Sequence, residues 1–459
     1  MKRVFKGKKI TIMGLGLHGG GVGVAKFFCR QGARVLITDL KTKRELKESL
    51  EKLKRFNIEY VLGCHRKKDF INTDLVIRNP GVPKDSYFLK IARANNVPVE
   101  TDITIFFRLC PGKIIGITGT KGKSTVATLV YQILKTKYKN TILAGNIGIS
   151  PLEFLSRVNK KTKVVLELSS FELEDLKKSP DIAVITCILP DHLDRYKNMK
   201  EYVETKKIIF KYQKEDDFLV LNYDDPLIRR FSLSAPSKVC FYSVKVLPKK
   251  KKNLICFLKN TNIFFVGEKK TIFNTEKLKI YGEHNVSNVL AAISVGKILK
   301  IPSKNIKKVL SNFKGVSGRQ EFIREVKGVK YFNDTTATMP EATITALKTF
   351  SQRFPGSKII LIAGGVNKKL DYKELAQEIQ KRVTHLILLP GSASEKIKEK
   401  LKNKVKISLV DSMKKAVKKA SKIAKRGDVV LLSPASASFN LFKNEFDRGD
   451  QFVKFVKHL

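Results

Sequence analysis

The sequence predicts an α/β protein of three domains, and three observations support this fold class. The chain has 459 residues, which is too long for one ordinary hydrophobic core. Short apolar runs alternate with stretches of helical periodicity, as in proteins built on parallel sheets. Several of these runs end in Gly, Pro or Ser, which is typical of buried strands with ligand-binding loops at the carboxyl edge of a sheet.

The first predicted domain spans residues 1–101 and contains a glycine-rich turn. The strand-like segment KITIM is followed by GLGLHG, by the helix-periodic segment VGVAKFFCRQG and by a second strand, ARVLITD. Gly14, Gly16 and Gly19 form a G-x-G-x-x-G pattern, and Asp39 ends the second strand. This pattern is typical of a Rossmann-like domain that binds a dinucleotide, so an NAD-dependent dehydrogenase is one alternative.

The second predicted domain spans residues 102–315 and contains a P-loop-type phosphate-binding loop. The strand KIIGIT precedes the loop and the helix VATLVYQILK follows it, so backbone N–H groups and a helix N-terminus would face phosphates. We expect Lys123 to neutralise phosphate oxygens and the hydroxyl of Ser124 or Thr125 to bind Mg²⁺. The loop has the shorter G-T-x-G-K-[ST] form, because Ile117 stands where the longer pattern requires glycine. The loop residues are Gly119, Thr120, Lys121, Gly122, Lys123, Ser124 and Thr125.

Acidic residues and a histidine follow two further strands of this domain. Glu167 ends the strand VVLEL, and Asp191 and His192 follow the strand IAVITCIL. Each alone would be an ordinary polar strand end or loop residue. Next to a phosphate loop, however, they offer ligands for a hard cation that screens the charge of a triphosphate.

The third predicted domain spans residues 316–459. It contains three apolar runs bounded by Gly, Pro or Ser, namely KIILIAGG, HLILLPG and DVVLLSPAS. These runs predict a second Rossmann-like sheet with ligand-binding loops at its carboxyl edge.

The phosphate loop, Glu167 and the segment DHLDR at 191–195 resemble motifs of the Mur ligases and their folylpolyglutamate synthetase relatives. The resemblance covers nearly the whole chain and implies an ATP-dependent ligase that joins an amino acid to a carboxylate. It implies ATP and two Mg²⁺ ions as cofactors, with catalytic roles for Lys123, His192 and a carbamylated Lys206. The implied metal ligands are Ser124, Thr125, Glu167, His192 and Lys206. The implied ATP contacts outside the loop are Asn285, Asn288, Arg319 and Asp334.

The glycine-rich turn and the C-terminal segment LLSPASASFNLFKNEFDRGDQF are similar to one branch of this family. The substrates of that branch are UDP-N-acetylmuramoyl-L-alanine and D-glutamate, in cytoplasmic peptidoglycan precursor synthesis. The implied UDP-sugar contacts are Gly14, Gly16, Leu17, His18, Asp39, Asn146 and His192, and the implied glutamate contacts are Thr338, Lys368 and Ser438. The chain departs from the pattern at Thr336, where many members have lysine, and at Glu445, where many have an aromatic residue. A Mur-type ligase for another amino acid, such as L-glutamate, is therefore a second alternative.

The chain is strongly basic, with 90 Lys+Arg against 42 Asp+Glu and a formal net charge of +48. A nucleic-acid-binding protein is the alternative that this charge suggests. The lysines are spread over the whole chain, and the densest run, at 249–252, lies between the strand-like segments VCFYSVKV and NLICFL. We therefore predict a solvated hairpin loop at this run and expect no nucleic-acid partner.

Cysteine usage and hydropathy indicate a cytoplasmic protein. The six cysteines are scattered without a C-x-x-C pair, so we expect reduced thiols. The sequence contains no run of eighteen apolar residues, which argues against a membrane span. We expect the protein to be a monomer.

Overall fold

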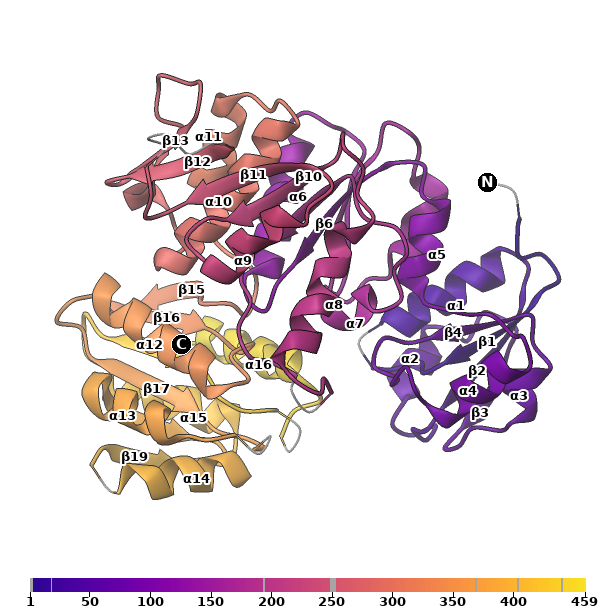
Figure 1. The fold of residues 1–459 in the computed structure, drawn as a ribbon. Coiled ribbons are helices and arrows are strands. Elements are labelled where there is room, and N and C mark those ends of the chain that lie inside the picture. The colour runs from indigo at the N-terminus through magenta and orange to yellow at the C-terminus, as the bar shows by residue number, and fades with distance from the viewer. Residues whose placement is uncertain are drawn as a thin grey trace. The chain divides into compact units, whose positions relative to one another are not determined.

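The computed structural model describes residues 3–17, 19–192, 195–247, 253–367, 370–402, 404–438 and 441–459. The described residues contain three β-sheets, of five, nine and six strands (Figure 1). The chain divides into two compact units, Met1–Lys277 with Val286–Leu310, and Leu278–Asn285 with Ser311–Leu459. The predicted α/β fold with three sheets is confirmed. The residue boundaries of the three predicted domains stay a prediction.

The five-stranded sheet is parallel, in the order β3-β2-β1-β4-β5. Its strands are β1 (Lys9–Met13), β2 (Arg34–Asp39), β3 (Ile58–Leu62), β4 (Leu75–Arg78) and β5 (Val99–Glu100). Its helices are α1 (Gly20–Arg30), α2 (Lys47–Glu51), α3 (Lys68–Ile71) and α4 (Tyr87–Ala94). Since strand side chains alternate between faces, Ile10 and Ile12 join the core under α1, whereas Met13 packs with Phe70 and Leu89 of α3 and α4. The sheet is therefore covered on both faces, and its carboxyl edge remains for the glycine-rich turn.

The nine-stranded sheet lies in the same compact unit, in the order β14-β13-β12-β11-β10-β9-β6-β8-β7. Its strands are β6 (Lys113–Thr118), β7 (Thr141–Gly145), β8 (Lys163–Glu167), β9 (Ile182–Ile185), β10 (Phe218–Asn222), β11 (Lys238–Ser243), β12 (Leu254–Lys259), β13 (Asn262–Phe265) and β14 (Phe273–Asn274). The α-helices of this region are α5 (Asp102–Leu109), α6 (Lys123–Lys135), α7 (Ser170–Leu173), α8 (Met199–Lys211), α9 (Pro226–Arg230), α10 (Glu283–Ile298) and α11 (Ser303–Asn312). Three short 3₁₀ helices are η1 (Pro151–Arg157), η2 (Phe231–Leu233) and η3 (Thr275–Lys277).

The predicted hairpin around residues 249–252 is wrong. The two flanking strands, β11 and β12, pair in parallel, with Phe241 opposite Leu254 and Tyr242 opposite Cys256. A hairpin requires antiparallel strands, and the antiparallel pair is instead β12 with β13. The sequence of two strand-like segments around a polar run does not show whether the strands pair in parallel or antiparallel. Residues 248–252 lie outside the described residues.

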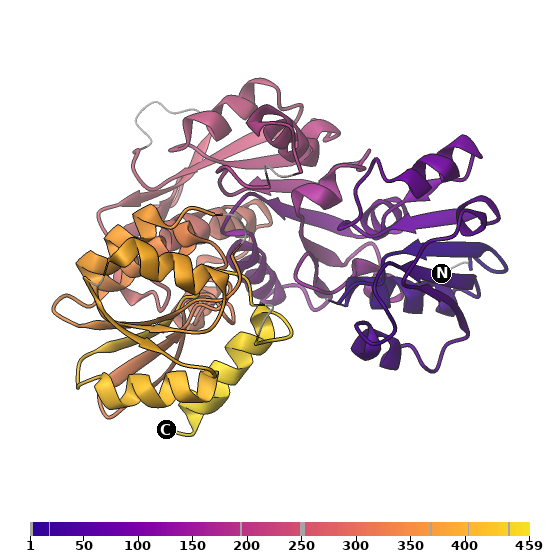
Figure 2. The same cartoon turned by 90° about the horizontal axis from the view of Figure 1, so that it is seen from below.

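The six-stranded sheet belongs to the second compact unit, in the order β15-β16-β20-β17-β18-β19. Its strands are β15 (Glu321–Val326), β16 (Val329–Asn333), β17 (Ile359–Ala363), β18 (Val383–Leu388), β19 (Lys406–Leu409) and β20 (Val429–Leu432). Its helices are α12 (Pro340–Arg353), α13 (Lys373–Arg382), α14 (Ser392–Leu401), α15 (Met413–Ile423) and α16 (Glu445–Lys457). Val429 and Leu431 pack with α12, α13 and α14, whereas Val430 and Leu432 pack with α15 and α16. Helices cover both faces of this sheet (Figure 2). The central strand is thus buried on both faces, as its continuous apolar sequence indicates.

All helices in the described ranges are too short or too polar to span a lipid bilayer.

Candidate active site

The phosphate loop lies where four parallel strands end side by side. The strands β9, β6, β8 and β7 are consecutive neighbours in the nine-stranded sheet. Parallel neighbours have their carboxyl ends at the same edge. The segments that begin at Thr186, Gly119, Leu168 and Asn146 therefore meet there, although they are far apart in sequence.

The loop requires two of its glycines. Gly119 has φ 143° and Gly122 has φ 84°, conformations that side-chain-bearing residues rarely adopt. A Cβ at Gly119 would overlap Thr186 Oγ1, and a Cβ at Gly122 would overlap Asn288 Oδ1. The loop is therefore fixed by the strand-end residue Thr186 and by Asn288 on α10.

Hydrogen bonds within the loop and to Cys187 hold the loop in place. The Thr120 N–H donates to Cys187 O at 2.7 Å, and the Lys121 N–H donates to Cys187 Sγ at 3.3 Å. Lys123 Nζ donates to the carbonyl oxygens of Gly119 and Thr120 at 2.9 and 3.0 Å. The ammonium group thus lies over the loop, where it could meet phosphate oxygens. Ser124, in the first turn of α6, is buried.

Glu167 has one carboxylate oxygen that suits a cation. Asn146 Nδ2 donates to Glu167 Oε1 at 3.0 Å, and Glu167 itself is only 2% exposed. Its other oxygen, Oε2, is buried and has no hydrogen-bond partner among the described residues. A buried carboxylate oxygen without a donor is costly. A hard cation would compensate it, so the donor set fits Mg²⁺.

Lys206 is buried under the phosphate loop. It is 1% exposed, and its Nζ donates to Thr118 Oγ1 at 3.1 Å and to Gly119 O at 3.2 Å. Burial, followed by the nearby charge of Lys123, holds the pKa of Lys206 well below its usual range. The next residue differs, because Lys207 pairs with Glu204 at 3.0 Å. Of the two lysines, Lys206 is therefore the one whose amine lies against the loop.

His192 follows β9 and contacts an aromatic side chain. Its ring lies 4.8 Å from the ring of Phe171, measured between centroids. The guanidinium carbon of Arg195 lies 4.1 Å from the centroid of the same ring. His192 has φ 55°, and its N–H donates to Asp191 Oδ1 at 3.1 Å. The backbone of His192 is therefore supported by its neighbour Asp191, and its ring by Phe171.

A buried arginine connects the five-stranded sheet to the segment after α7. Arg78, at the end of β4, is fully buried, and its Nη2 donates to Asp175 Oδ2 at 2.5 Å. Its Nη1 donates to Val82 O at 2.7 Å. Arg195 Nη2 donates to the same carbonyl oxygen at 3.3 Å. These contacts join the two sheets of the first compact unit beside His192.

The glycine-rich turn of the five-stranded sheet is held by Asp39. Asp39 Oδ2 accepts the N–H groups of Leu15 and Gly16 at 2.9 and 3.2 Å, and Oδ1 accepts the Lys41 N–H at 2.9 Å. The carboxylate therefore fixes the turn, a role that the sequence reading did not assign to it. Its predicted contact with uracil stays a prediction. Leu17, in the same turn, is 41% exposed.

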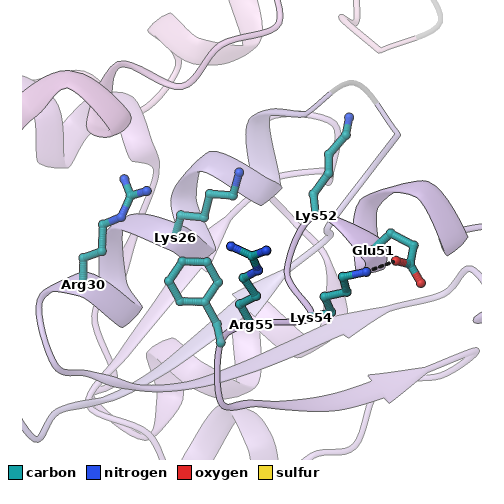
Figure 3. A pocket seen from close by; sticks show the side chains of 7 residues that line it. Lys26, Arg30, Glu51, Lys52, Lys54 and Arg55 are labelled. Carbon is teal, nitrogen blue, oxygen red and sulfur yellow. Dashed lines mark hydrogen bonds and ion pairs between the residues drawn. The ribbon is translucent and has the colours of Figure 1, made fainter.

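A basic pocket lies elsewhere on the same sheet (Figure 3). Its lining residues are Lys26, Arg30, Glu51, Lys52, Lys54, Arg55 and Phe56. These residues belong to the ends of α1 and α2 and the segment just before β3, which places them at the amino edge of the sheet. The glycine-rich turn is at the carboxyl edge. The pocket is therefore separate from the predicted nucleotide site.

The six-stranded sheet has unpaired hydroxyl groups after its central strand. Ser436 and Ser438 follow β20, and each has a buried Oγ without a hydrogen-bond partner among the described residues. Ala435, just before them, has φ 58°, an uncommon conformation for a residue with a side chain. Buried orphan hydroxyls and a strained backbone are features of ligand-binding segments. Ser438 was predicted from the sequence to contact glutamate, whereas Ser436 was not predicted to bind a ligand.

Asp334, at the end of β16, is buried in the same region. Its Oδ2 accepts Ser433 Oγ at 2.9 Å, and its Oδ1 accepts the Gln320 N–H at 3.1 Å. Burial raises the pKa of Asp334 to about 7, although the two hydrogen bonds and Arg319 oppose this shift. The folded protein therefore retains a proton here at pH values where the unfolded chain has released it.

This pKa shift predicts that Asp334→Asn stabilises the protein at alkaline pH. Because the folded pKa is raised, stability falls as pH rises from about 4 to about 7, and the full cost persists above that window. The neutral amide avoids this cost, so we expect a gain on the order of 2 kcal/mol at about pH 8 and none at about pH 3. Urea unfolding at both pH values measures the gain. Asp450→Asn, at an exposed site on α16, serves as the control, and an equal gain at both pH values would contradict the assignment.

Some predicted residues lie apart from these contacts or outside the described residues. His18, Asp194 and Lys368 are outside them. Asn285 and Asn288 lie one turn apart at the start of α10, and Asn285 Nδ2 donates to Tyr281 O at 2.7 Å. No three His, Cys, Asp or Glu side chains cluster as a metal site in the described part of the chain.

Three other predicted positions lie near the start of the six-stranded sheet. Thr336 Oγ1 donates to Gly318 O at 2.9 Å, and the Thr338 N–H donates to Thr336 O at 2.9 Å. Glu445 begins α16, and its carbonyl oxygen accepts Thr335 Oγ1 at 2.7 Å. Of the two positions that depart from the family pattern, Thr336 makes this contact with its side chain, and Glu445 makes its contact with its backbone carbonyl.

Comparison with known proteins gives three consecutive family matches. Residues 8–101 match the Mur ligase MurD-like N-terminal domain, residues 117–296 the Mur ligase middle domain, and residues 318–436 the Mur ligase glutamate ligase domain. The UDP-N-acetylmuramoylalanine–D-glutamate ligase of Roseiflexus sp. (strain RS-1) is 42% identical, over 98% of each chain. The ligase of the same name from Borreliella burgdorferi (strain ATCC 35210) is 39% identical, over 99% of this chain and 98% of that one.

Solved structures agree on the fold. UDP-N-acetylmuramate-alanine ligase MurC from Thermotoga maritima has a TM-score of 0.66 at 21% identity, with 98% of this chain and 99% of that chain covered. A pseudomurein peptide ligase type C from Methanothermus fervidus has a TM-score of 0.59 at 22% identity, with the same coverage. Domain matches along the chain and relatives of nearly equal length lead to one conclusion: the chain belongs to the Mur ligase family.

Proposed function

We propose that this protein uses ATP to add D-glutamate to UDP-N-acetylmuramoyl-L-alanine in the synthesis of peptidoglycan precursors. The relatives that are 36–42% identical over nearly the full chain carry the name of this ligase. The observation that carries the proposal is the loop Gly119–Thr125, with Lys206 and the orphan oxygen of Glu167 in the same compact unit. The dehydrogenase alternative is set aside, because it leaves this second phosphate loop unexplained.

The reaction proceeds in two steps. The γ-phosphoryl group of ATP is transferred to the L-alanine carboxylate, which gives an acyl phosphate and ADP. The glutamate amine then attacks the acyl carbon, phosphate leaves from the tetrahedral intermediate, and the amine nitrogen loses a proton. Lys123 neutralises charge on the transferred phosphoryl group, and the loop N–H groups orient it in line with the acceptor. The protein therefore acts through positioning and charge neutralisation.

The residues Ser124, Thr125, Glu167, His192 and Lys206 would hold the Mg²⁺ ions. When bound, Mg²⁺ screens the negative charges of the phosphates and the acceptor carboxylate. An ammonium group at Lys206 would repel a cation. The lowered pKa of Lys206 favours its neutral amine, which adds to CO₂ and releases a proton to form a carbamate. That carbamate supplies the oxygen ligand which an unmodified lysine lacks.

The incoming glutamate is assigned to the second compact unit. The support is the buried, unpartnered Oγ of Ser438, near which Thr338 and Lys368 are predicted to complete the contacts. A cationic lysine against a glutamate carboxylate forms a charge-assisted hydrogen bond. The UDP part of the other substrate is assigned to the turn from Gly14 to Gly19.

Phosphate release from ATP tests this function directly. The purified protein is supplied with UDP-N-acetylmuramoyl-L-alanine, Mg²⁺ and bicarbonate, with D-glutamate or L-glutamate in parallel. We expect release that requires both the nucleotide sugar and D-glutamate, because both carboxylate and amine must be present for turnover. Release with L-glutamate alone would retain the chemistry and contradict the amino-acid assignment. No release with either amino acid would contradict the proposed function.

A further inference from the structure

Helix α16 carries a buried arginine that contacts two separate loops of the second compact unit. Arg448 lies in the first turns of α16 and is 0% exposed. Its Nη2 donates to Thr335 O at 2.8 Å, and its Nε donates to Thr335 Oγ1 at 3.1 Å. Its Nη1 donates to Ser436 O at 3.2 Å. One guanidinium group therefore links the segment after β16 with the segment after β20.

These two segments carry residues predicted to bind the incoming amino acid. Thr338 lies three residues after Thr335, and Ser438 lies two residues after Ser436. On its other side, the segment after β20 is held by Val366, whose N–H donates to Ala437 O at 2.9 Å. The backbone that carries the buried Oγ atoms of Ser436 and Ser438 is therefore anchored at two successive carbonyl oxygens, those of Ser436 and Ala437.

The burial of this cation is costly, and its partners are two carbonyl oxygens and a hydroxyl group. Burial lowers the pKa of Arg448 to about 10, partly offset by the charge of Glu445. An apolar side chain of similar length would fill the volume without this desolvation cost. Such an apolar side chain could not donate three hydrogen bonds in fixed directions, as the planar guanidinium group does. The arginine therefore specifies the geometry of the loops more than it stabilises the fold.

Close packing of the helix supports this role. A Cβ at Gly449 would lie 2.6 Å from Thr335 Cγ2, so the helix approaches the loop without space for a side chain. Asn444 caps the helix, because its Oδ1 accepts the Asp447 N–H at 2.9 Å. The start of α16 is thus a rigid support for Arg448.

We propose that Arg448 is a positioning residue for the glutamate site, which it shapes by fixing Thr338 and Ser438 relative to each other. This inference rests on the proposed function. Asp334 has separate supports in Ser433 Oγ and the Gln320 N–H, so the predicted ATP contact does not depend on Arg448. Loss of the arginine should therefore weaken glutamate binding selectively.

Steady-state kinetics of two variants test the inference. Arg448→Lys keeps a cation and some of the donors, whereas Arg448→Met keeps the approximate volume and no donor. We expect the KM for D-glutamate to rise about 5-fold in the lysine variant and about 30-fold or more in the methionine variant, because misplaced contacts weaken binding. The KM values for ATP and for the UDP-sugar should stay within about 2-fold, since their contacts have other supports. Arg382→Lys on α13, where the arginine pairs with Glu378 at 2.6 Å, serves as the matched control.

The outcomes separate the inference from the function on which it rests. A wild-type protein that does not respond to D-glutamate contradicts the proposed function before any variant is compared. An active wild type with an unchanged KM for D-glutamate in both folded variants overturns the inference. An equal rise of all three KM values also overturns it, because that result indicates general loosening of the domain. If the methionine variant does not fold, the test rests on the lysine variant. That variant must then show a rise in the KM for D-glutamate without a matching rise in the other two KM values.

Discussion

Replacing Lys206 with alanine is expected to reduce phosphate release by about 10²-fold or more, because the site loses the group that forms the carbamate. The wild-type amine is buried against Thr118 and Gly119 and has a strongly lowered pKa. Turnover of the wild type should accordingly depend on bicarbonate. Formate or acetate should restore part of the activity of the variant, since either can place a carboxylate in the space that the side chain leaves. Assays in CO₂-free buffer, with and without these anions, measure both effects.

The adjacent lysine provides a matched control for this substitution. Lys207 is the same residue type at the next position of the same helix, but its Nζ pairs with Glu204 at 3.0 Å. We expect Lys207→Ala to keep full activity and to show no response to formate. Undiminished turnover of Lys206→Ala, or a wild type indifferent to bicarbonate, would contradict the carbamate assignment.

The second large effect is expected for Lys123→Ala, which should lower ATP turnover by about 10³-fold. Lys123 Nζ lies over the loop, within hydrogen-bond distance of two loop carbonyl oxygens. Its alanine variant loses the cation that neutralises the transferred phosphoryl group, while the glycines and strand-end contacts that shape the loop remain. We therefore expect kcat to fall much more than the unfolding midpoint changes, and calorimetry alongside the phosphate-release assay measures both.

Lys135→Ala is the control for this variant. It removes an exposed lysine from the last turn of the same helix. Both variants reduce the net charge equally, so a general electrostatic effect on nucleotide binding would appear in each. Equal losses in the two variants would be incompatible with a specific role for Lys123.

The strand–loop–helix element around Gly119 was predictable because its signal is local. A strand, two glycines with special backbone angles and a helix N-terminus follow one another directly, so the spacing of Gly119, Gly122 and Lys123 identifies the element. The supports of the loop were not predictable in this way. Thr186 and Cys187 contact it only because β9 pairs with β6, and strand order is a property of the whole sheet.

Burial explains two further differences between the sequence reading and the structure. Lys206 and Lys207 are the same residue type at adjacent positions, so the sequence does not tell them apart. In the structure they lie on different faces of α8, which buries the amine of Lys206 and leaves Lys207 paired with Glu204. Arg448 is one of 90 Lys+Arg residues, and no local pattern marks it as buried. Asp39 was predicted to end the second strand, as it does in β2, whereas its hydrogen bonds to the glycine-rich turn were not foreseen.

The strand order β9-β6-β8-β7 also has a consequence for how the protein acquires activity. The residues at the shared strand edge come from segments near 119, 146, 167 and 186, and both pairings of β6, with β8 and with β9, join strands that are not consecutive in the chain. Parallel pairings between distant segments require closure of long loops, which slows their formation relative to local helices. A partly folded chain can therefore contain α6 and the glycine loop without the neighbours that shape them. We therefore expect nucleotide binding to be acquired late in folding, when the last of these central strands has joined the sheet.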